Sequence, residues 1–130
     1  MTLIQRNYDP AIMLGGKDGN FVLGSTVTQA TNRTTGVTIN ALSGQITTNT
    51  ASLAAETAAV FTVTNSACAA DDIPIIAIAG GSNGGNTTIA VTTIAAGSFQ
   101  ITVANQNASG GTAETGAIVI TFLIQKAAIS

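Results

Sequence analysis

The sequence contains no histidine and no tryptophan, and only one cysteine, among its 130 residues. Without histidine, neither a histidine-based catalytic triad nor a histidine metal site can form, and the commonest general base is missing. The single cysteine, Cys68, rules out an internal disulfide. A cysteine nucleophile needs a cation nearby, whereas Cys68 precedes two acids, Asp71 and Asp72, which raise the pKa of a thiol. We therefore predict no catalytic residue, no cofactor-binding residue and no metal ligand, and a protein that is not an enzyme.

Charged side chains are also scarce. They make up 8% of the chain, against about 25% in an average globular domain, and the formal net charge is −2. Because net charge normally keeps molecules apart in solution, so neutral a surface indicates that much of it is covered in an assembly. The alternative is a surface that is polar but uncharged, made of Thr, Ser, Asn and Gln side chains.

Several classes of partner and location are disfavoured by what is missing. The four basic residues are scattered and cannot form the stripe that binding to a phosphate backbone requires, so we predict no nucleic-acid partner. No apolar run approaches the roughly 18 residues of a membrane span, so no membrane partner is predicted. No secretory signal is recognised at the start of the sequence, and nothing in the chain demands an oxidising compartment. The basic residues are Arg6, Lys17, Arg33 and Lys126.

The chain changes character near residue 20. Residues 1–20 hold four of the ten charged residues, both methionines and the only tyrosine, and they show no clean period of two or 3.6. We interpret residues 1–20 as an N-terminal arm that becomes ordered by packing on something else. A frayed terminus is the alternative. Residues 21–130 are predicted to form one β-domain.

From residue 21 onward the pattern is that of short β-strands. Eight runs rich in Val, Ile, Thr and Phe are separated by Gly, Asn or Ser. The sequence therefore predicts an all-β fold, an antiparallel β-sandwich. Eight strands favour the jelly-roll type, and an immunoglobulin-like sandwich is the alternative. The runs are FVLGSTVTQ, GVTINA, GQITT, AAVFTVTN, IPIIAIA, NTTIAVTTI, SFQITVA and GAIVITFLIQ.

Two of these runs break the alternation expected of a strand with one solvated face. Most runs alternate, so that Phe61 and Val63 are predicted to face inward. In the last run, however, Ile118, Ile120, Phe122 and Ile124 share one face while Val119 and Leu123 occupy the other, and Ile73 and Ile75 similarly oppose Ile76 and Ile78. We expect both faces of these strands to be covered. For the last strand we favour a contact with another subunit, and burial under the arm is the alternative.

The acidic residues offer little for catalysis. Asp71 and Asp72 are adjacent and would point to opposite faces of a strand, so we interpret them as the polar cap of a turn before Ile73. A glycosidase would need two carboxylates across a cleft, for which Glu56 with Glu114 or Asp71 is the only candidate combination. The glycine-rich GGSNGGN at residues 80–86 leads into no helix and is interpreted as a connection between strands.

Residues 31–126 resemble a β-domain of tailed-phage and prophage structural proteins. The most specific parts are GVTINALSGQITT, FTVTNS and AAGSFQITVAN. The domain occurs in small capsid-associated proteins and at the distal end of fibre-like virion proteins. The resemblance implies a β-sandwich virion component that commonly works as a trimer, and it brings no catalytic residue with it.

A single such domain with an N-terminal arm resembles a capsid decoration, or cement, protein more than a fibre, because no repetitive shaft is present. We predict a virion protein, made in the host cytoplasm, that binds the outside of the phage head and stabilises the shell by bridging coat subunits. Its predicted partners are the major capsid protein and itself, as a homotrimer. The alternative is a fibre-tip or head-fibre domain that recognises a host glycan or surface protein. The predicted interface residues are Ile4, Tyr8, Ile12, Met13 and Leu14 in the arm, with Val119 and Leu123 on the last strand.

Overall fold

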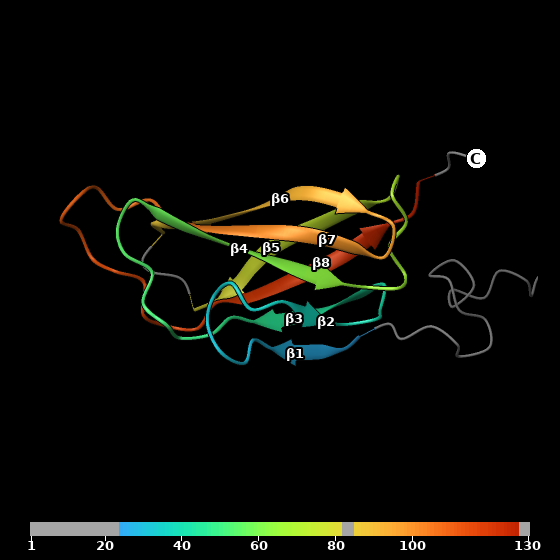
Figure 1. Ribbon diagram of the computed structural model, residues 1–130, viewed down its shortest axis with the longest axis horizontal. Helices are drawn as coiled ribbons and strands as arrows, with labels where there is room; N and C mark the ends of the chain where they lie inside the picture. The colour runs from blue at the N-terminus through green and yellow to red at the C-terminus, as the bar shows by residue number, and fades with distance from the viewer. Residues whose placement is uncertain (1–23, 82–84, 128–130) are drawn as a thin grey trace, which may run out of the picture.

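The computed structural model describes residues 24–81 and 85–127. Eight strands, and no helix, are found in these two ranges (Figure 1). Each strand overlaps one of the eight predicted runs, in the predicted order and with no end more than one residue outside its run, so the all-β prediction is confirmed. The strands are β1 (Thr26–Thr28), β2 (Val37–Thr38), β3 (Ser43–Thr47), β4 (Thr57–Thr64), β5 (Ile73–Gly80), β6 (Thr87–Ala95), β7 (Ser98–Asn105) and β8 (Val119–Gln125).

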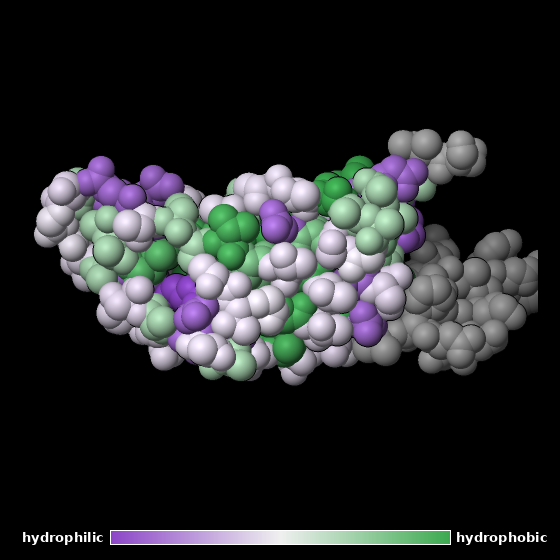
Figure 2. Space-filling view, viewed as in Figure 1, coloured by the Kyte–Doolittle hydropathy of each residue, from purple (hydrophilic) through white to green (hydrophobic). Residues whose placement is uncertain are grey.

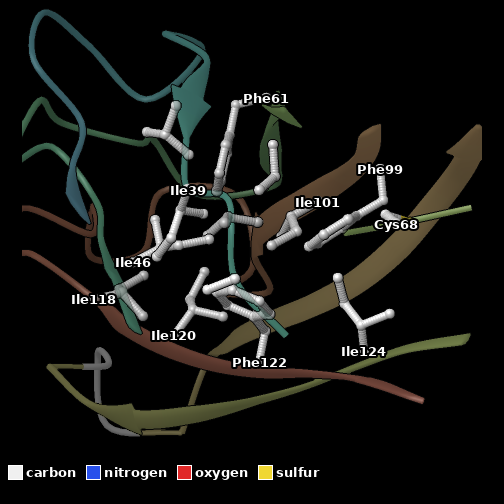
Figure 3. Close-up of a cluster of buried hydrophobic side chains, with 14 of the residues drawn as sticks. Ile39, Ile46, Phe61, Cys68, Phe99, Ile101, Ile118, Ile120, Phe122 and Ile124 are labelled. Atoms are coloured by element: carbon white, nitrogen blue, oxygen red, sulfur yellow. The ribbon is translucent and has the colours of Figure 1, made fainter. Parts of the chain in front are cut away.

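The strands form two four-stranded sheets that pack together as a β-sandwich. The strand order is β1-β3-β8-β5 in the first sheet and β2-β4-β7-β6 in the second. Aliphatic and aromatic side chains from the two inner faces meet in one core (Figure 3). Phe99 of the second sheet and Phe122 of the first bring their rings together, with centroids 5.9 Å apart at 57°. This tilted arrangement is one that aromatic pairs prefer. The core therefore joins the two sheets directly.

The predicted alternation of inward and outward side chains accounts for which residues lie on the inner faces of the two sheets. Phe61 and Val63 on β4 are 2% and 0% exposed, while Thr64 beside them is exposed. On β7 the pattern repeats, with Phe99, Ile101 and Val103 buried. The period of two in side-chain direction along a strand thus decides which residues enter the core.

The prediction that the sheets are wholly antiparallel is wrong, because both are mixed. β1 runs parallel to β3, and β2 runs parallel to β4. The chain passes from the first sheet to the second and back between β1 and β3, so that β3 returns in the direction of β1. Parallel neighbours require such a crossover, which a simple hairpin cannot provide.

Gly44 allows β1 to lie close to β3. A Cβ atom at this position would stand 2.5 Å from the backbone oxygen of Ser25 and 3.2 Å from the ring of Phe122. The same Ser25 oxygen accepts a hydrogen bond of 2.8 Å from the N–H of Gln45. The absence of a side chain at Gly44 therefore permits the parallel pairing at this edge of the sandwich.

Candidate interaction surface

None of the eight strands contains a charged residue. The six charged residues of the described part of the chain all lie outside the strands, at the two ends of the sandwich. Arg33, Glu56 and Glu114 lie at the end where β3 and β7 finish, and Asp71, Asp72 and Lys126 lie at the other end. Soluble proteins commonly protect sheet faces and edges with charged side chains. The two broad faces of this sandwich lack that protection.

The outer face of the first sheet carries a cluster of exposed apolar side chains on β5 and β8. Ile73, Ile75 and Leu123 are 53%, 50% and 42% exposed. Ile75 lies directly opposite Leu123 in the ladder, and Ile73 lies two residues away on the same face. We call these three residues the β5–β8 patch. Cross-strand neighbours on one face are close enough to act as a single surface.

The opposite sheet has fewer exposed apolar side chains on its outer face. Val60 on β4 is 42% exposed, and its ladder neighbours are Thr102 and, one strand further, Ala90. The face shown in Figure 2 is dominated by pale, near-neutral residues, with apolar residues in small separate groups. The three-residue β5–β8 patch is therefore the larger apolar cluster among the exposed aliphatic side chains of the strands.

The two sides of the sandwich differ in their edges. β1 and β2 are edge strands of three and two residues, whereas β5 and β6, at the other side, have eight and nine. Pro74 is compatible with its place on β5, because its partner Ile124 donates its N–H to Leu42 on the β3 side. The backbone nitrogen of Pro74 therefore points away from β8, where a missing N–H removes no strand-to-strand hydrogen bond. The long edges lie on the side that carries the patch.

The structure places two of the seven predicted interface residues. Leu123 is on the outer face and belongs to the patch, and Val119 is half-buried on the same face, opposite Thr47. Ile73 and Ile75 were not predicted as interface residues, although the broken alternation of their strand was the signal that marks them. The arm, residues 1–20, lies outside the described residues, as do its predicted interface residues Ile4, Tyr8, Ile12, Met13 and Leu14.

Arg33 holds the loops together at one end of the sandwich. Its guanidinium is buried and donates hydrogen bonds to the backbone oxygens of Ala51, Glu114 and Gly116 and to the hydroxyl of Thr48. Burial lowers the pKa of Arg33, and the carboxylate of Glu114 opposes this by raising it. Sequence reasoning treated Arg33 only as one of four scattered cations. Its role is structural, since it joins segments that are far apart in the chain.

Glu114 also joins the loops at this end of the sandwich. Its carboxylate accepts hydrogen bonds of 2.6 Å from the Thr87 hydroxyl and 3.2 Å from the N–H of Gly116, and the residue is 3% exposed. Its backbone also pairs with Leu53. In Figure 1 the β3–β4 and β7–β8 connections extend side by side from this end of the sandwich, and this pairing ties them to each other.

The carboxylates do not form a glycosidase pair. Glu56 and Asp71 lie at opposite ends of β4, whose eight residues span about 26 Å at 3.3 Å each, whereas paired catalytic carboxyls lie within about 10 Å. A shallow hollow of about 310 Å³ is lined by Glu56, Thr57, Ala58, Ala104, Asn105 and Gln106, and it holds one carboxylate. Glu114 is buried and bonded to protein groups.

Asp72 caps the turn before β5, as predicted. Its side chain is 3% exposed and accepts a hydrogen bond of 2.8 Å from the N–H of Ala69 and one of 3.2 Å from the N–H of Ala127. It also forms an ion pair with Lys126, which donates to the backbone oxygen of Ala67 as well. Asp72 thereby fastens the chain after β8 to the loop before β5. The patch residues Ile73 and Leu123 lie at this same end.

Cys68 lies buried beside this turn, at 4% exposure. Burial raises the pKa of its thiol, the carboxylate of Asp72 raises it further, and Lys126 opposes both. The predicted direction is confirmed, although burial is the leading cause. A thiol with a raised pKa is a poor nucleophile, and Cys68 serves as a small core residue.

Acid should weaken the fold through Asp72. Burial raises the pKa of this carboxyl, but the hydrogen bonds from Lys126, Ala69 and Ala127 outweigh it, so the pKa is lowered. A carboxyl with a lowered folded-state pKa contributes stability above its unfolded value of about 3.9, and this stability is lost as the pH falls through the folded-state value. We expect the free energy of unfolding to decrease below about pH 4.

Asp72→Asn should remove the part of this acid dependence that Asp72 supplies and lower stability at pH 7 by about 1–3 kcal/mol. Urea unfolding at pH 7 and pH 3 checks both expectations. Asp71→Asn is the matched control, because Asp71 is exposed. This substitution should leave unchanged the difference in the free energy of unfolding between pH 7 and pH 3. If Asp72→Asn left the pH dependence of the free energy of unfolding unchanged, Asp72 would not be a source of that dependence.

Residues 24–81 and 85–127 contain no group of three or more His, Cys, Asp or Glu side chains that could hold a metal ion. No helix in these same ranges has the length and apolar character needed to cross a membrane. Comparison with known proteins adds no relative: no protein-family model, no curated protein and no solved structure matches the chain. The resemblance to phage structural proteins therefore stays a prediction.

Proposed function

We propose that this chain is a non-enzymatic virion protein that decorates the outside of a tailed-phage head. The observation that carries the proposal is a β-sandwich with no charged residue on any of its eight described strands and an exposed apolar patch on β5 and β8. Surfaces of this kind are typical of proteins that are buried in an assembly, because an isolated neutral apolar face promotes association.

The proposed arrangement is a homotrimer bound to the major capsid protein. The β5–β8 patch with Val119 supplies the contact between subunits, and the N-terminal arm with Ile4 and Tyr8 reaches the coat. Three modest contacts on one rigid body add avidity without a single tight site. Binding to the assembled shell alone stabilises that shell by mass action. Within the class of β-sandwiches we propose the jelly-roll type, since eight strands in two sheets of four match its count.

Attachment to heads tests the proposal. Purified chain added to phage heads assembled without it should cosediment at a saturable ratio. Ile4→Ala with Tyr8→Ala should weaken the attachment at least tenfold, because the arm loses an aliphatic and an aromatic anchor worth more than about 1.4 kcal/mol together. Ile4→Leu with Tyr8→Phe is the matched control and should bind close to normally.

The β-sandwich should stay folded in both variants, as judged by circular dichroism. Absence of saturable binding by the unaltered chain would sink the decoration function. Binding to host cells instead would favour the fibre-tip alternative, in which residues 80–86 and 105–115 take part in the recognition.

A further inference from the structure

We propose that the β5–β8 patch is the docking site for residues 11–14 of a neighbouring copy of this chain, so that subunits are joined by exchanged N-terminal segments. This inference rests on the self-association within the proposed function and names the segment that covers the patch. It is carried by the position of the patch, by the reach of the chain that precedes Gly24, and by the chemistry of residues 11–14.

The patch lies at the end of the sheet where the described chain begins. β1 runs parallel to β3, and β5 also runs in this direction because both β3 and β5 are antiparallel to β8. The starts of β1 and β5 therefore lie at the same end. Gly24 lies two residues before the start of β1, and Ile73 is the first residue of β5. The segment before Gly24 thus joins the sandwich on the patch's own end.

The spacing along the chain favours a neighbouring molecule over the same one. β1 and β5 are three strand spacings apart, about 14 Å at 4.8 Å each. Residues 11–14 precede Gly24 by 10 to 13 residues, which span about 33–45 Å when extended. An extended path across its own sheet would carry residues 11–14 past the edge of β5. About 19–31 Å of reach then remains beyond the edge of β5, which is available for the patch of a second copy packed against that edge.

The chemistry of the two surfaces is matched. Residues 11–14 are Ala, Ile, Met and Leu, and the uncharged run continues from Pro10 to Gly16. The patch is likewise aliphatic, and its ladder neighbours on the outer face, Ala77, Thr121 and Ser43, are uncharged. Residues 1–9 instead contain Arg6 and Asp9, which suit a polar partner such as the coat. The low charge of the patch favours this uncharged run over a charged partner surface.

Disulfide trapping tests the exchange. In a Cys68→Ala background, Ile12→Cys is made in one preparation and Leu123→Cys in another, and the two are unfolded, mixed, refolded and oxidised. A disulfide between the two preparations can only be intermolecular. We expect it to form in at least half of the mixed protein. Ile73→Cys replaces Leu123→Cys in a second mixture, so that one unfavourable bond geometry does not decide the result.

The control mixture pairs Ile12→Cys with Val60→Cys, which lies on the opposite sheet at the same 42% exposure as Leu123. It should give less than a tenth of the cross-link. Absence of cross-linking at both Leu123→Cys and Ile73→Cys overturns the proposal, as does equal cross-linking to Val60→Cys. A double variant carrying Ile12→Cys and Leu123→Cys that oxidises only within single chains also overturns it, because the segment then covers its own patch.

The outcome is independent of capsid attachment, since no capsid is present. Cross-linking of a chain that fails to bind heads would reject decoration and keep the exchange. Binding to heads by a chain that fails to cross-link would reject the exchange and support decoration.

Discussion

Arg33→Ala is expected to lower the free energy of unfolding by about 3–5 kcal/mol, the range for removing one partner of a buried charged network. The guanidinium is buried and bonds to four oxygens from two different connections, β3–β4 and β7–β8. Its loss removes one donor from each of these acceptors. The Glu114 oxygen and the Thr48 hydroxyl keep hydrogen bonds from the N–H groups of Leu53 and Ile118, and each group left unsatisfied adds a desolvation penalty. Urea unfolding followed by circular dichroism measures the change.

Arg33→Lys is the matched control for charge. Lysine keeps the positive charge but has one compact ammonium group in place of the planar guanidinium. It can therefore satisfy only some of the four acceptors. We expect Arg33→Lys to remain at least about 1.5 kcal/mol less stable than the unaltered chain. If Arg33→Ala stayed within 1 kcal/mol, on the order of an ordinary surface substitution, the loops would not depend on this residue.

Ile75→Ser with Leu123→Ser is expected to convert the proposed trimer into monomers while the sandwich stays folded. Full burial of an aliphatic side chain contributes about 1.5–3 kcal/mol, and each of these two is already half-buried in the single chain. A subunit contact that covers the exposed half of each side chain contributes about 1 kcal/mol per side chain. Two side chains at three interfaces total roughly 6 kcal/mol, or about 10⁴-fold in the association constant of the trimer.

The matched control for this variant is Val60→Ser. Val60 is as exposed as Leu123 and lies on the outer face of the opposite sheet. Light scattering on a sizing column gives the mass, and urea unfolding confirms that the sandwich is intact. A trimer that survives Ile75→Ser with Leu123→Ser, or that is lost equally with Val60→Ser, would show that the patch is not the contact between subunits.

The strands could be predicted because side-chain direction alternates along each of them. Phe61 and Val63 against Thr64 follow directly from that period, and so does the entry of Phe99 and Phe122 into the core. The direction of pairing could not be predicted in the same way. Whether β3 runs parallel or antiparallel to β1 depends on how the chain crosses between sheets, which leaves no mark on the residues of either strand.

The candidate surface was visible in the sequence only as an exception. Ile73, Ile75 and Leu123 break the alternation, which signals an apolar outer face but does not show what covers it. Arg33 and Glu114 gave no signal, because each is buried by loops that meet only in the folded protein. A short-range pattern cannot report a hydrogen bond between residues 81 positions apart, such as that from Arg33 to the backbone of Glu114.

The most direct test of the central claim is the solution mass of the purified chain, measured by light scattering during size-exclusion chromatography. We expect one species with three times the 12.9 kDa mass of the protomer. A species that stays at 12.9 kDa at every concentration up to the millimolar range would contradict it. The neutral strands and the exposed Ile73, Ile75 and Leu123 would then belong to a protein that does not associate with itself.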